Sequence, residues 1–524
     1  MSGIEDLQQR IASLRLDPSA IEEIRLHGEH GGVVQNKKGQ LASLQIYASI
    51  TSNDGFISPS AAKEGLGIYG RELRKVAREN RGKHPHIDRL EKIARSDKSV
   101  RCDVIRHEAS RPLPDRIARA LPEALRRFPT PFHIYDEQGI RETARAYKNA
   151  FAWVKPAYKN YFAVKACPNP HIVRILQQEG FGTDCSSLAE LIISERLGLR
   201  GEDIMFTSND TPVEEFIKAR ELGAIINLDD ITHIGYLDQN AGMPELVCFR
   251  YNPGPLREGS SFIGNPVEAK YGVTTGQIKG AYMKARELGA KRFGMHTMIV
   301  SNMLDEHYLV ETAVMLFKLV AMINHDTGFQ FDFINLGGGF GTPYKPEQKA
   351  IDLNMVSTGI QAAYKTYIED TGLAPVRIVT ECGRAMTGPH GYLVTKVRHV
   401  AKKYKDYVGV DACMSNLMRP ALYGAYHHIT VLGKEDRPKD HIYDVTGSLC
   451  ENNDKFAVNR PLPEIERGDV LVLHNAGAHG YAMGFQYNAR LRSAELLVMP
   501  DGSIEQIRRA ETVDDYLGTI ERWP

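Results

Sequence analysis

The 524-residue sequence predicts an α/β fold, a (β/α)8 barrel followed by an antiparallel β barrel or sandwich, with a helical extension at the N-terminus. Three observations lead to this prediction. β-rich runs alternate with helical stretches in mid-chain, strands broken by Gly, Pro and Asp follow, and apolar residues recur at helical spacing before both. We expect an N-terminal extension over residues 1–105, a lead-in contributing to the β domain over 106–135, the barrel over 136–390 and the β domain over 391–524.

The number of strands in the middle segment indicates a closed barrel. Eight βα units within about 220 residues are typical of a parallel barrel, whose active site lies where the strands end. The expected barrel strands are 161–164, 181–184, 204–207, 224–228, 246–251, 292–297, 331–336 and 376–381.

The flanking segments have other patterns. The β domain is expected to hold strands at 391–400, 407–410, 427–432, 441–445, 470–474 and 494–499. In the extension, Leu66, Tyr69, Leu73 and Val76 recur at steps of three and four, as on one face of a helix. A second helix is expected through Ile117, Leu121 and Leu125.

The charge balance argues against a nucleic-acid partner or an anionic membrane. Lys+Arg and Asp+Glu both number 65, so the formal net charge is zero. From Lys63 to Arg127, 18 Lys/Arg face 10 Asp/Glu, a surplus of 8. Because both signs are interspersed there, we expect a solvated helical surface rather than an RNA site.

Cysteine usage and hydropathy indicate a reducing, cytoplasmic setting. The seven cysteines include no CxxC pair, which argues against a disulfide framework or a structural zinc site. The start of the chain is polar, and no apolar run approaches the roughly 20 residues that span a bilayer. No metal site is expected, and His427, His428, His474 and His479 are read as ordinary strand histidines, although His479 could line the active site.

Three motifs at predicted strand ends carry chemistry. Lys165 follows the first barrel strand, where a partly desolvated amine with a lowered pKa could form a Schiff base; a solvated surface lysine is the alternative. Gly337, Gly338 and Gly339 follow the seventh strand and could let backbone N–H groups approach a phosphate, or form a flexible turn. The eighth strand ends in Glu381-Cys-Gly-Arg384. Together, a Schiff-base lysine, a phosphate loop and a buried acid are what pyridoxal 5'-phosphate requires.

On these residues the sequence resembles the fold-type III, alanine-racemase-like pyridoxal-phosphate decarboxylases, and among them the diaminopimelate decarboxylases. The resemblance extends from about Phe128 to Leu517. It rests on ordered motifs: Phe-Ala-Val-Lys165, Asp184-Cys-Ser-Ser with Glu190, Gly337-Gly-Gly339, Glu381-Cys-Gly-Arg384, Asp411-Ala-Cys-Met, Arg419-Pro-Ala-Leu-Tyr423, Cys450-Glu451 and Tyr487-Asn488.

The resemblance implies a role for each matched position. Lys165 would bind the cofactor aldehyde, Glu381 would pair with the ring nitrogen, and His296 would lie against the ring. Cys450 would donate the proton that replaces carbon dioxide. The implied cofactor-binding set is Lys165, Asp184, His296, Ser301, Gly337, Gly338, Gly339, Glu381, Arg384 and Tyr487. The implied substrate-binding set is Arg384, Arg419, Tyr423, Glu451 and Tyr487.

The resemblance also implies a homodimer with shared active sites, in which Cys450 and Glu451 of each chain reach into the site of the partner. The reaction it implies is the conversion of meso-2,6-diaminopimelate to L-lysine and carbon dioxide. Arg419 and Tyr423 would bind the far carboxylate of the substrate, for which the arginine fork is well suited. Glu451 would meet the far amine. An ornithine or lysine substrate would leave Arg419 unmatched.

Several departures keep other readings open. Thr297 to Val300, Cys382, Asn452 and His479 differ from the family pattern. One alternative is therefore a decarboxylase of the same fold acting on a D-amino acid, ornithine or lysine, carboxynorspermidine or an intermediate of a specialised pathway. Another is a non-catalytic cofactor-binding relative, against which the presence of Lys165, Glu381 and Cys450 argues. The N-terminal extension could dock another protein, enlarge the dimer interface or cover the active site.

Overall fold

The N-terminal extension is a separate α/β unit. The computed structural model describes residues 7–8, 10–11, 14, 21–28, 31–35, 40–52, 55–106, 112–259 and 264–521. The polar start of the chain, residues 1–6, lies outside them. Four antiparallel strands in the order β2-β1-β4-β3 pack against helices around a core of their own that includes Ile24, Tyr47 and Leu90. The elements are β1 (Ile21–Leu26), β2 (Gly32–Gln35), α2 (Leu41–Ile50), β3 (Phe56–Ile57), α3 (Pro59–Glu79), α4 (Pro85–Arg95) and β4 (Val100–Arg106).

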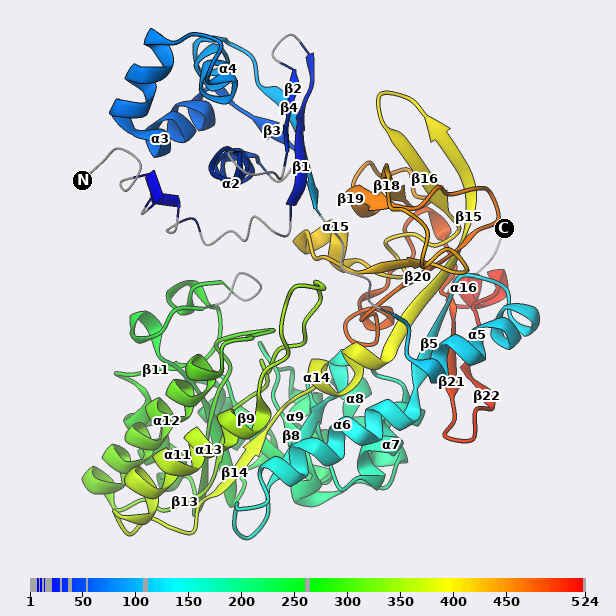
Figure 1. Ribbon diagram of the computed structural model, residues 1–524. Helices are drawn as coiled ribbons and strands as arrows, with labels where there is room; N and C mark the ends of the chain where they lie inside the picture. The colour runs from blue at the N-terminus through cyan, green and yellow to red at the C-terminus, as the bar shows by residue number, and fades with distance from the viewer. Residues whose placement is uncertain are drawn as a thin grey trace.

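The predicted helical face is confirmed only in part on α3. Leu66 and Tyr69 are buried and Leu73 packs against the same core, but Val76 is 41% exposed. The helix is kinked at Gly70, so its two parts do not present one continuous face. The four-stranded sheet was not foreseen. Two of its strands are short, β2 with 4 residues and β3 with 2. In Figure 1 this unit, drawn in blue, lies apart from the barrel and beside the β domain.

The middle of the chain closes into the predicted eight-stranded parallel barrel. Neighbouring strands pair in parallel throughout, and the pairings β9–β10 and β14–β6 close the ring. All eight expected strands are confirmed, each to within two residues at either end. They are β6 (Lys159–Ala163), β7 (Gly182–Cys185), β8 (Ile204–Phe206), β9 (Ile225–Leu228), β10 (Leu246–Asn252), β12 (Arg292–Thr297), β13 (Phe331–Asn335) and β14 (Arg377–Thr380), with a short outer strand β11 (Val273–Thr274) on β10.

Helices follow the barrel strands and cover them in Figure 1. Local sequence fixes several of their ends. Asp136 and Asp305 accept hydrogen bonds from backbone N–H groups at the starts of α6 and α12, and Gly328, in the left-handed region, ends α12. The helices are α6 (Glu137–Ala150), α7 (Pro170–Gln178), α8 (Leu188–Arg196), α9 (Val213–Glu221), α10 (Thr232–Ala241), α11 (Ile278–Glu287), α12 (Glu306–Thr327) and α13 (Leu353–Tyr364).

The β domain is built around β5 (Phe132–Asp136), which precedes the barrel in the chain. β5 pairs with β15 on one side and β21 on the other. Most pairs are antiparallel, but β5–β21 and β16–β18 are parallel. The strands β19 and β22 were not predicted. The elements are β15 (Gly391–Lys402), β16 (Asp406–Val410), β17 (Ile429–Val431), β18 (His441–Thr446), β19 (Lys455–Leu462), β20 (Val470–Leu473), β21 (Ala494–Val498), β22 (Ile504–Arg508), α5 (Asp115–Arg127), α14 (Arg384–Thr387), α15 (Arg419–Tyr423) and α16 (Val513–Leu517).

Two expectations drawn from the whole sequence, on membrane-spanning segments and on cysteines, can be compared with the structure. Within the described part of the chain, no helix has both the length and the apolar character needed to cross a bilayer. All seven cysteines are free thiols. Six of them are buried, and Cys450 is exposed.

Candidate active site

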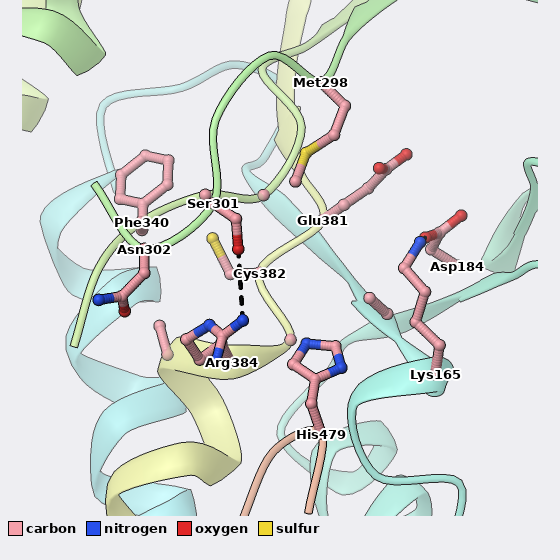
Figure 2. A pocket seen from close by; sticks show the side chains of 15 residues that line it. Lys165, Asp184, Met298, Ser301, Asn302, Phe340, Glu381, Cys382, Arg384 and His479 are labelled. Carbon is pink, nitrogen blue, oxygen red and sulfur yellow. Dashed lines mark hydrogen bonds and ion pairs between the residues drawn. The ribbon is translucent and has the colours of Figure 1, made fainter. Parts of the chain in front are cut away.

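A cavity with about 460 Å³ of empty space opens where the barrel strands end, next to the β domain. Its walls come from segments far apart in the sequence, including His479 of the β domain, as Figure 2 shows. The position agrees with the rule that barrel active sites lie at the carboxyl ends of the strands. The lining residues are Ala163, Lys165, Asp184, Met298, Ser301, Asn302, Gly338, Gly339, Phe340, Glu381, Cys382, Gly383, Arg384, Ala385 and His479.

Lys165 extends into this cavity from a 3₁₀ turn directly after β6 (Figure 2). Its Nζ lies 3.5 Å from Asp184 Oδ2 and 3.5 Å from Ser186 Oγ. Burial of its surroundings acts to lower the lysine pKa, but the carboxylates of Asp184, Glu381 and Glu190 outweigh it and raise the pKa above its ordinary value. The expected lowering of the Lys165 pKa is therefore wrong for the chain alone, because three carboxylates surround the amine.

Asp184 and Glu381 are both buried, yet they titrate in opposite directions. Burial, and then the charge of Glu381, raise the pKa of Asp184 well above its usual range, against the opposing effect of Lys165. Burial also acts to raise the pKa of Glu381, but His296, Lys165 and Asn335 hold it below its ordinary value. The negative charge of this carboxyl pair therefore resides on Glu381.

Glu381 is held by two buried side chains from the neighbouring strands β12 and β13. Asn335 Nδ2 donates a hydrogen bond of 2.7 Å to Oε1, and His296 Nε2 lies 3.2 Å from Oε2. On its far side, His296 Nδ1 lies 2.7 Å from the amide nitrogen of Asn227. That amide donates to Nδ1, which leaves the proton of a neutral ring on Nε2, facing Glu381. The carboxylate thus has a fixed orientation at the end of β14.

The loop Gly337–Gly339 packs so closely against neighbouring backbone that only glycine fits, and its residues Gly338 and Gly339 line the cavity. Gly337 and Gly339 have φ of +70° and +88°. A Cβ at Gly337 would lie 2.3 Å from the carbonyl oxygen of Thr297, and one at Gly338 would lie 2.9 Å from that of Glu381. This close approach of bare backbone is what a bound phosphate needs.

Arg384 and Ser301 form a polar wall beside this loop. Arg384 donates to Ser301 Oγ at 3.3 Å, the contact drawn in Figure 2, and to the hydroxyl of Tyr344 at 2.8 Å. Both side chains were predicted to be here. The cation therefore lies across the cavity from the carboxylates of Asp184 and Glu381, as the labelled side chains in Figure 2 show.

Arg419, the predicted partner of the substrate's far carboxylate, lies behind this wall. It is 1% exposed, its guanidinium lies 4.5 Å from the centre of the Tyr344 ring, and it bonds to His427 Nε2 at 2.9 Å. His427 donates from Nδ1 to the carbonyl of His474, so its Nε2 accepts from Arg419. Burial, assisted by the charge of Arg384, lowers the pKa of Arg419 to about 10. Tyr344 thus joins the buried Arg419 to the partly buried Arg384.

Seven predicted site residues do not line the cavity. His296, Gly337 and Arg419 lie directly behind its wall, and the other four lie farther out. Tyr423 and Tyr487 are 46% and 50% exposed, Cys450 is exposed, and Glu451 is partly exposed beside it. The backbone N–H of Cys450 donates to Asn488 Oδ1 at 2.7 Å, so the Cys450 and Tyr487 loops lie together. A single chain therefore gathers the predicted cofactor-binding residues, except Tyr487, in and around the cavity. It does not bring Cys450 and Glu451 there.

Several residues of the site were not predicted as site residues. Met298, Asn302, Phe340 and Cys382 line the cavity, and Tyr344 lies between Arg384 and Arg419. Their residue types alone give no signal. His479 could be found, because it occupies a departure from the family pattern. Burial and the charges of Arg384, Arg419 and Lys165 lower its pKa well below the ordinary value, so it is neutral near neutral pH.

Comparisons with known families divide the chain as the structure does. The family described as "Pyridoxal-dependent decarboxylase, pyridoxal binding domain" matches residues 137–388. A second family, described as "Uncharacterized protein conserved in bacteria", matches residues 11–104, which include the separate N-terminal unit.

Similar proteins cover the barrel and the β domain. Protein TabA of Pseudomonas amygdali pv. tabaci is 43% identical over 409 residues, 78% of this chain and 95% of the relative. The diaminopimelate decarboxylase of Methanothermobacter thermautotrophicus is 35% identical over 391 residues, 74% of this chain and 91% of the relative. Among solved structures, the diaminopimelate decarboxylase of M. jannaschii in complex with L-lysine has a TM-score of 0.72 at 29% identity, covering 77% of this chain and 94% of that structure.

Proposed function

The chain belongs to the pyridoxal-dependent decarboxylases, in the group that includes the diaminopimelate decarboxylases, and we propose that it converts meso-2,6-diaminopimelate to L-lysine and carbon dioxide with pyridoxal 5'-phosphate as cofactor. One observation carries the proposal. A charged buried acid, a lysine and a glycine loop with an arginine face one cavity at the ends of three barrel strands. These are the three groups that a ring nitrogen, an aldehyde and a phosphate require.

The residues present fit this cofactor. Both oxygens of Asp184 are buried without a hydrogen-bond partner among the described residues, so this acid is ready for a donor on a bound molecule. The glycine loop has no side chain over it, and Arg384 supplies a positive charge beside it. When bound, the cofactor supplies an electron sink for the pair of electrons left when the carboxylate departs.

The residues of the chain position the reactants around that sink. Glu381 stays charged, and a carboxylate at the ring nitrogen favours its protonated form. His296, oriented by Asn227, places a flat imidazole ring beside Glu381. Lys165, with its raised pKa, carries a proton, which it must lose before it attacks an aldehyde. The protonation state of Asp184 beside it would determine how readily that proton leaves.

Substrate choice depends on the cations behind the cavity. Arg419 and Arg384 lie on either side of Tyr344, and burial strengthens the attraction of Arg419 for an anion. A substrate with a second carboxylate would place it here. Diaminopimelate has such a group, whereas ornithine and lysine have an ammonium at their far end, which two arginines would repel.

We propose further that the enzyme is a homodimer in which the partner subunit's Cys450 and the partner subunit's Glu451 complete each site. This is supported by the exposure of Cys450 and by its distance in sequence and structure from the cavity lining. Cys450 would then deliver the proton that replaces carbon dioxide. A cytoplasmic location is supported by the free state of all seven cysteines.

A second candidate is a decarboxylase of the same fold with another substrate. Three departures from the family pattern, Met298, Cys382 and His479, line the cavity itself. In addition, the name of the 43% identical relative, TabA, states no substrate. A rebuilt pocket would alter specificity and leave the cofactor groups in place.

One experiment separates the two candidates. Purified protein is supplied with pyridoxal 5'-phosphate and, in parallel, with meso-diaminopimelate, ornithine, lysine, arginine and carboxynorspermidine, and carbon dioxide and amine products are measured together. Stoichiometric L-lysine from diaminopimelate supports the first candidate. Cofactor absorbance without lysine formation refutes it and supports the second.

A further inference from the structure

Asn335, the last residue of β13, links the buried acid to the glycine loop. It is fully buried. Its Nδ2 donates to Glu381 Oε1 at 2.7 Å and faces Met205 Sδ at 3.0 Å, while its Oδ1 accepts from the backbone N–H of Gly337 at 2.9 Å. One side chain therefore contacts the two parts of the site that are suited to opposite ends of the cofactor.

Only a short amide can make both contacts. The side chain must donate to a carboxylate and accept from an N–H group at the same time. Aspartate has no donor when charged, and an aliphatic side chain has neither group. The two partners also fix the amide's orientation, because the reverse orientation would set an oxygen against Glu381 and an NH₂ against the N–H of Gly337.

The link is reinforced by the main chain. The backbone N–H of Glu381 donates to the carbonyl of Gly337 at 2.8 Å, so residues 337 and 381 are joined twice, once through backbone and once through Asn335. A larger residue does not fit at Gly337, since a Cβ there would lie 2.3 Å from the Thr297 carbonyl oxygen. With Oε2 facing His296, the Asn335 bond fixes the remaining oxygen of the acid.

We propose that Asn335 is a positioning residue, which holds the Glu381 carboxylate at a set spacing from the Gly337–Gly339 loop so that the ring nitrogen and the phosphate of one cofactor are bound together. The inference rests on the proposed use of pyridoxal 5'-phosphate. It does not depend on which amino acid is decarboxylated.

The chain offers a matched control in Asn160. This residue is also fully buried at a barrel strand, and its amide clamps the backbone of Cys382, accepting from its N–H at 2.7 Å and donating to its carbonyl at 3.1 Å. It lies next to the same strand end, but it bonds to the main chain of Cys382 rather than to the carboxylate of Glu381. Asn160→Ala thus removes a comparable buried amide without touching the acid.

The experiment compares wild type, Asn335→Ala, Asn335→Asp and Asn160→Ala. The readouts are the dissociation constant of pyridoxal 5'-phosphate, the pH dependence of the bound cofactor's absorbance, and kcat and KM separately. For Asn335→Ala we expect cofactor affinity and kcat each to fall about 10- to 100-fold, as for loss of a hydrogen bond to a charged group, with KM little changed. In Asn335→Asp a second carboxylate beside Glu381 raises the pKa of the pair, so the absorbance transition should move to higher pH.

Asn160→Ala should keep the wild-type pH dependence even if it lowers the melting temperature. A wild-type spectrum and kcat in a folded Asn335→Ala protein would overturn the proposal, and so would equal spectral changes in Asn160→Ala. If Asn335→Ala does not fold, the test uses Asn335→Asp, because aspartate has nearly the same shape as asparagine. An absorbance transition at the wild-type pH in that variant would overturn the proposal. A wild type that binds the cofactor but releases no lysine from diaminopimelate refutes the substrate and leaves this test intact.

Discussion

The amine of Lys165 lies 3.5 Å from Oδ2 of Asp184, a buried carboxyl whose pKa burial and Glu381 raise. The same contact raises the pKa of the lysine. Acid and amine therefore compete for protons at the point where the cofactor aldehyde is expected. The amine that must attack is therefore already in contact with a buried carboxyl before any ligand arrives.

Replacing Lys165 by Ala should abolish turnover and the absorbance of covalently bound cofactor, because no other amine lines the cavity in the described chain. Absorbance spectra and carbon dioxide release measure both effects. Lys159→Ala is the control, since Lys159 begins the same strand at the opposite end of the barrel. Substantial turnover in Lys165→Ala would contradict the assignment.

Replacing Glu381 by Gln should lower kcat about 100- to 1,000-fold while cofactor remains bound, because it removes the charge that stabilises the electron-rich ring. Steady-state kinetics at saturating cofactor measure the loss. Glu202→Gln serves for comparison: Glu202 pairs with Arg292 and Arg377, which begin β12 and β14 at the other end of the barrel. Near-normal kcat in Glu381→Gln would remove Glu381 from the mechanism.

Replacing Arg419 by Gln should raise the KM for diaminopimelate about 10- to 100-fold, with a smaller effect on kcat, since a charge-assisted bond to the far carboxylate is lost. Arg460→Lys is the control variant for Arg419→Gln. Arg460 is also buried and donates to the carbonyl of His427 at 2.9 Å, on the residue that holds Arg419. If the two variants raise KM equally, Arg419 only supports the fold of this region.

Acidification should lower the stability of the folded chain. Burial holds the pKa of His479 and His427 well below the ordinary value and that of His133 at about 4. Unfolding releases these rings to an ordinary pKa of about 6.5, so the unfolded chain binds more protons below that pH and the free energy of unfolding falls as pH falls. The effect is present from about pH 7 downward, at up to about 1.4 kcal/mol per pH unit for each ring.

Melting temperatures measured from about pH 7.5 to about pH 5.5 test this expectation. His479→Gln should show a smaller decrease than wild type. His325→Gln, which alters a side chain that is 89% exposed, should not. Identical slopes in wild type and His479→Gln would show that His479 takes up no extra proton on unfolding.

Mixing Lys165→Ala with Cys450→Ala should restore activity if sites are shared between subunits. Random exchange gives mixed dimers with one intact site each, and therefore about one quarter of wild-type activity. Activity is measured after co-expression, with differently tagged subunits to count mixed dimers. Mixed dimers without activity would mean that Cys450 serves no site across the interface.

The fold was predictable where local pattern and topology agree. The barrel strands are short β-rich runs bounded by turns and alternating with helical stretches, and eight such units are typical of a closed barrel. β19 escaped prediction because its run, Lys455–Leu462, contains Asn, Arg and Pro, and its pairing with β18 depends on residues distant in sequence. The N-terminal sheet escaped for a related reason, since β3 becomes a strand only through its pairing with β4.

The site was predictable where the chemistry demands one residue type. Lys165, Glu381 and the glycines were found in this way. Tyr344 and Asn335 were not, because a buried tyrosine or asparagine is common and its function appears only when folding places Arg384 or Glu381 beside it. The effect of Asp184 on the pKa of Lys165 likewise depends on a distance that no sequence pattern contains.

The position of β5 has a consequence for biosynthesis. This strand is made before the barrel, yet its two sheet partners, β15 and β21, are made after it. On the ribosome, β5 must therefore wait, unpaired, while residues 137–390 emerge and fold. A cell that makes this chain must protect one exposed apolar strand for the time needed to translate an entire barrel, and a fragment beginning at residue 391 would lack a central strand of its own sheet.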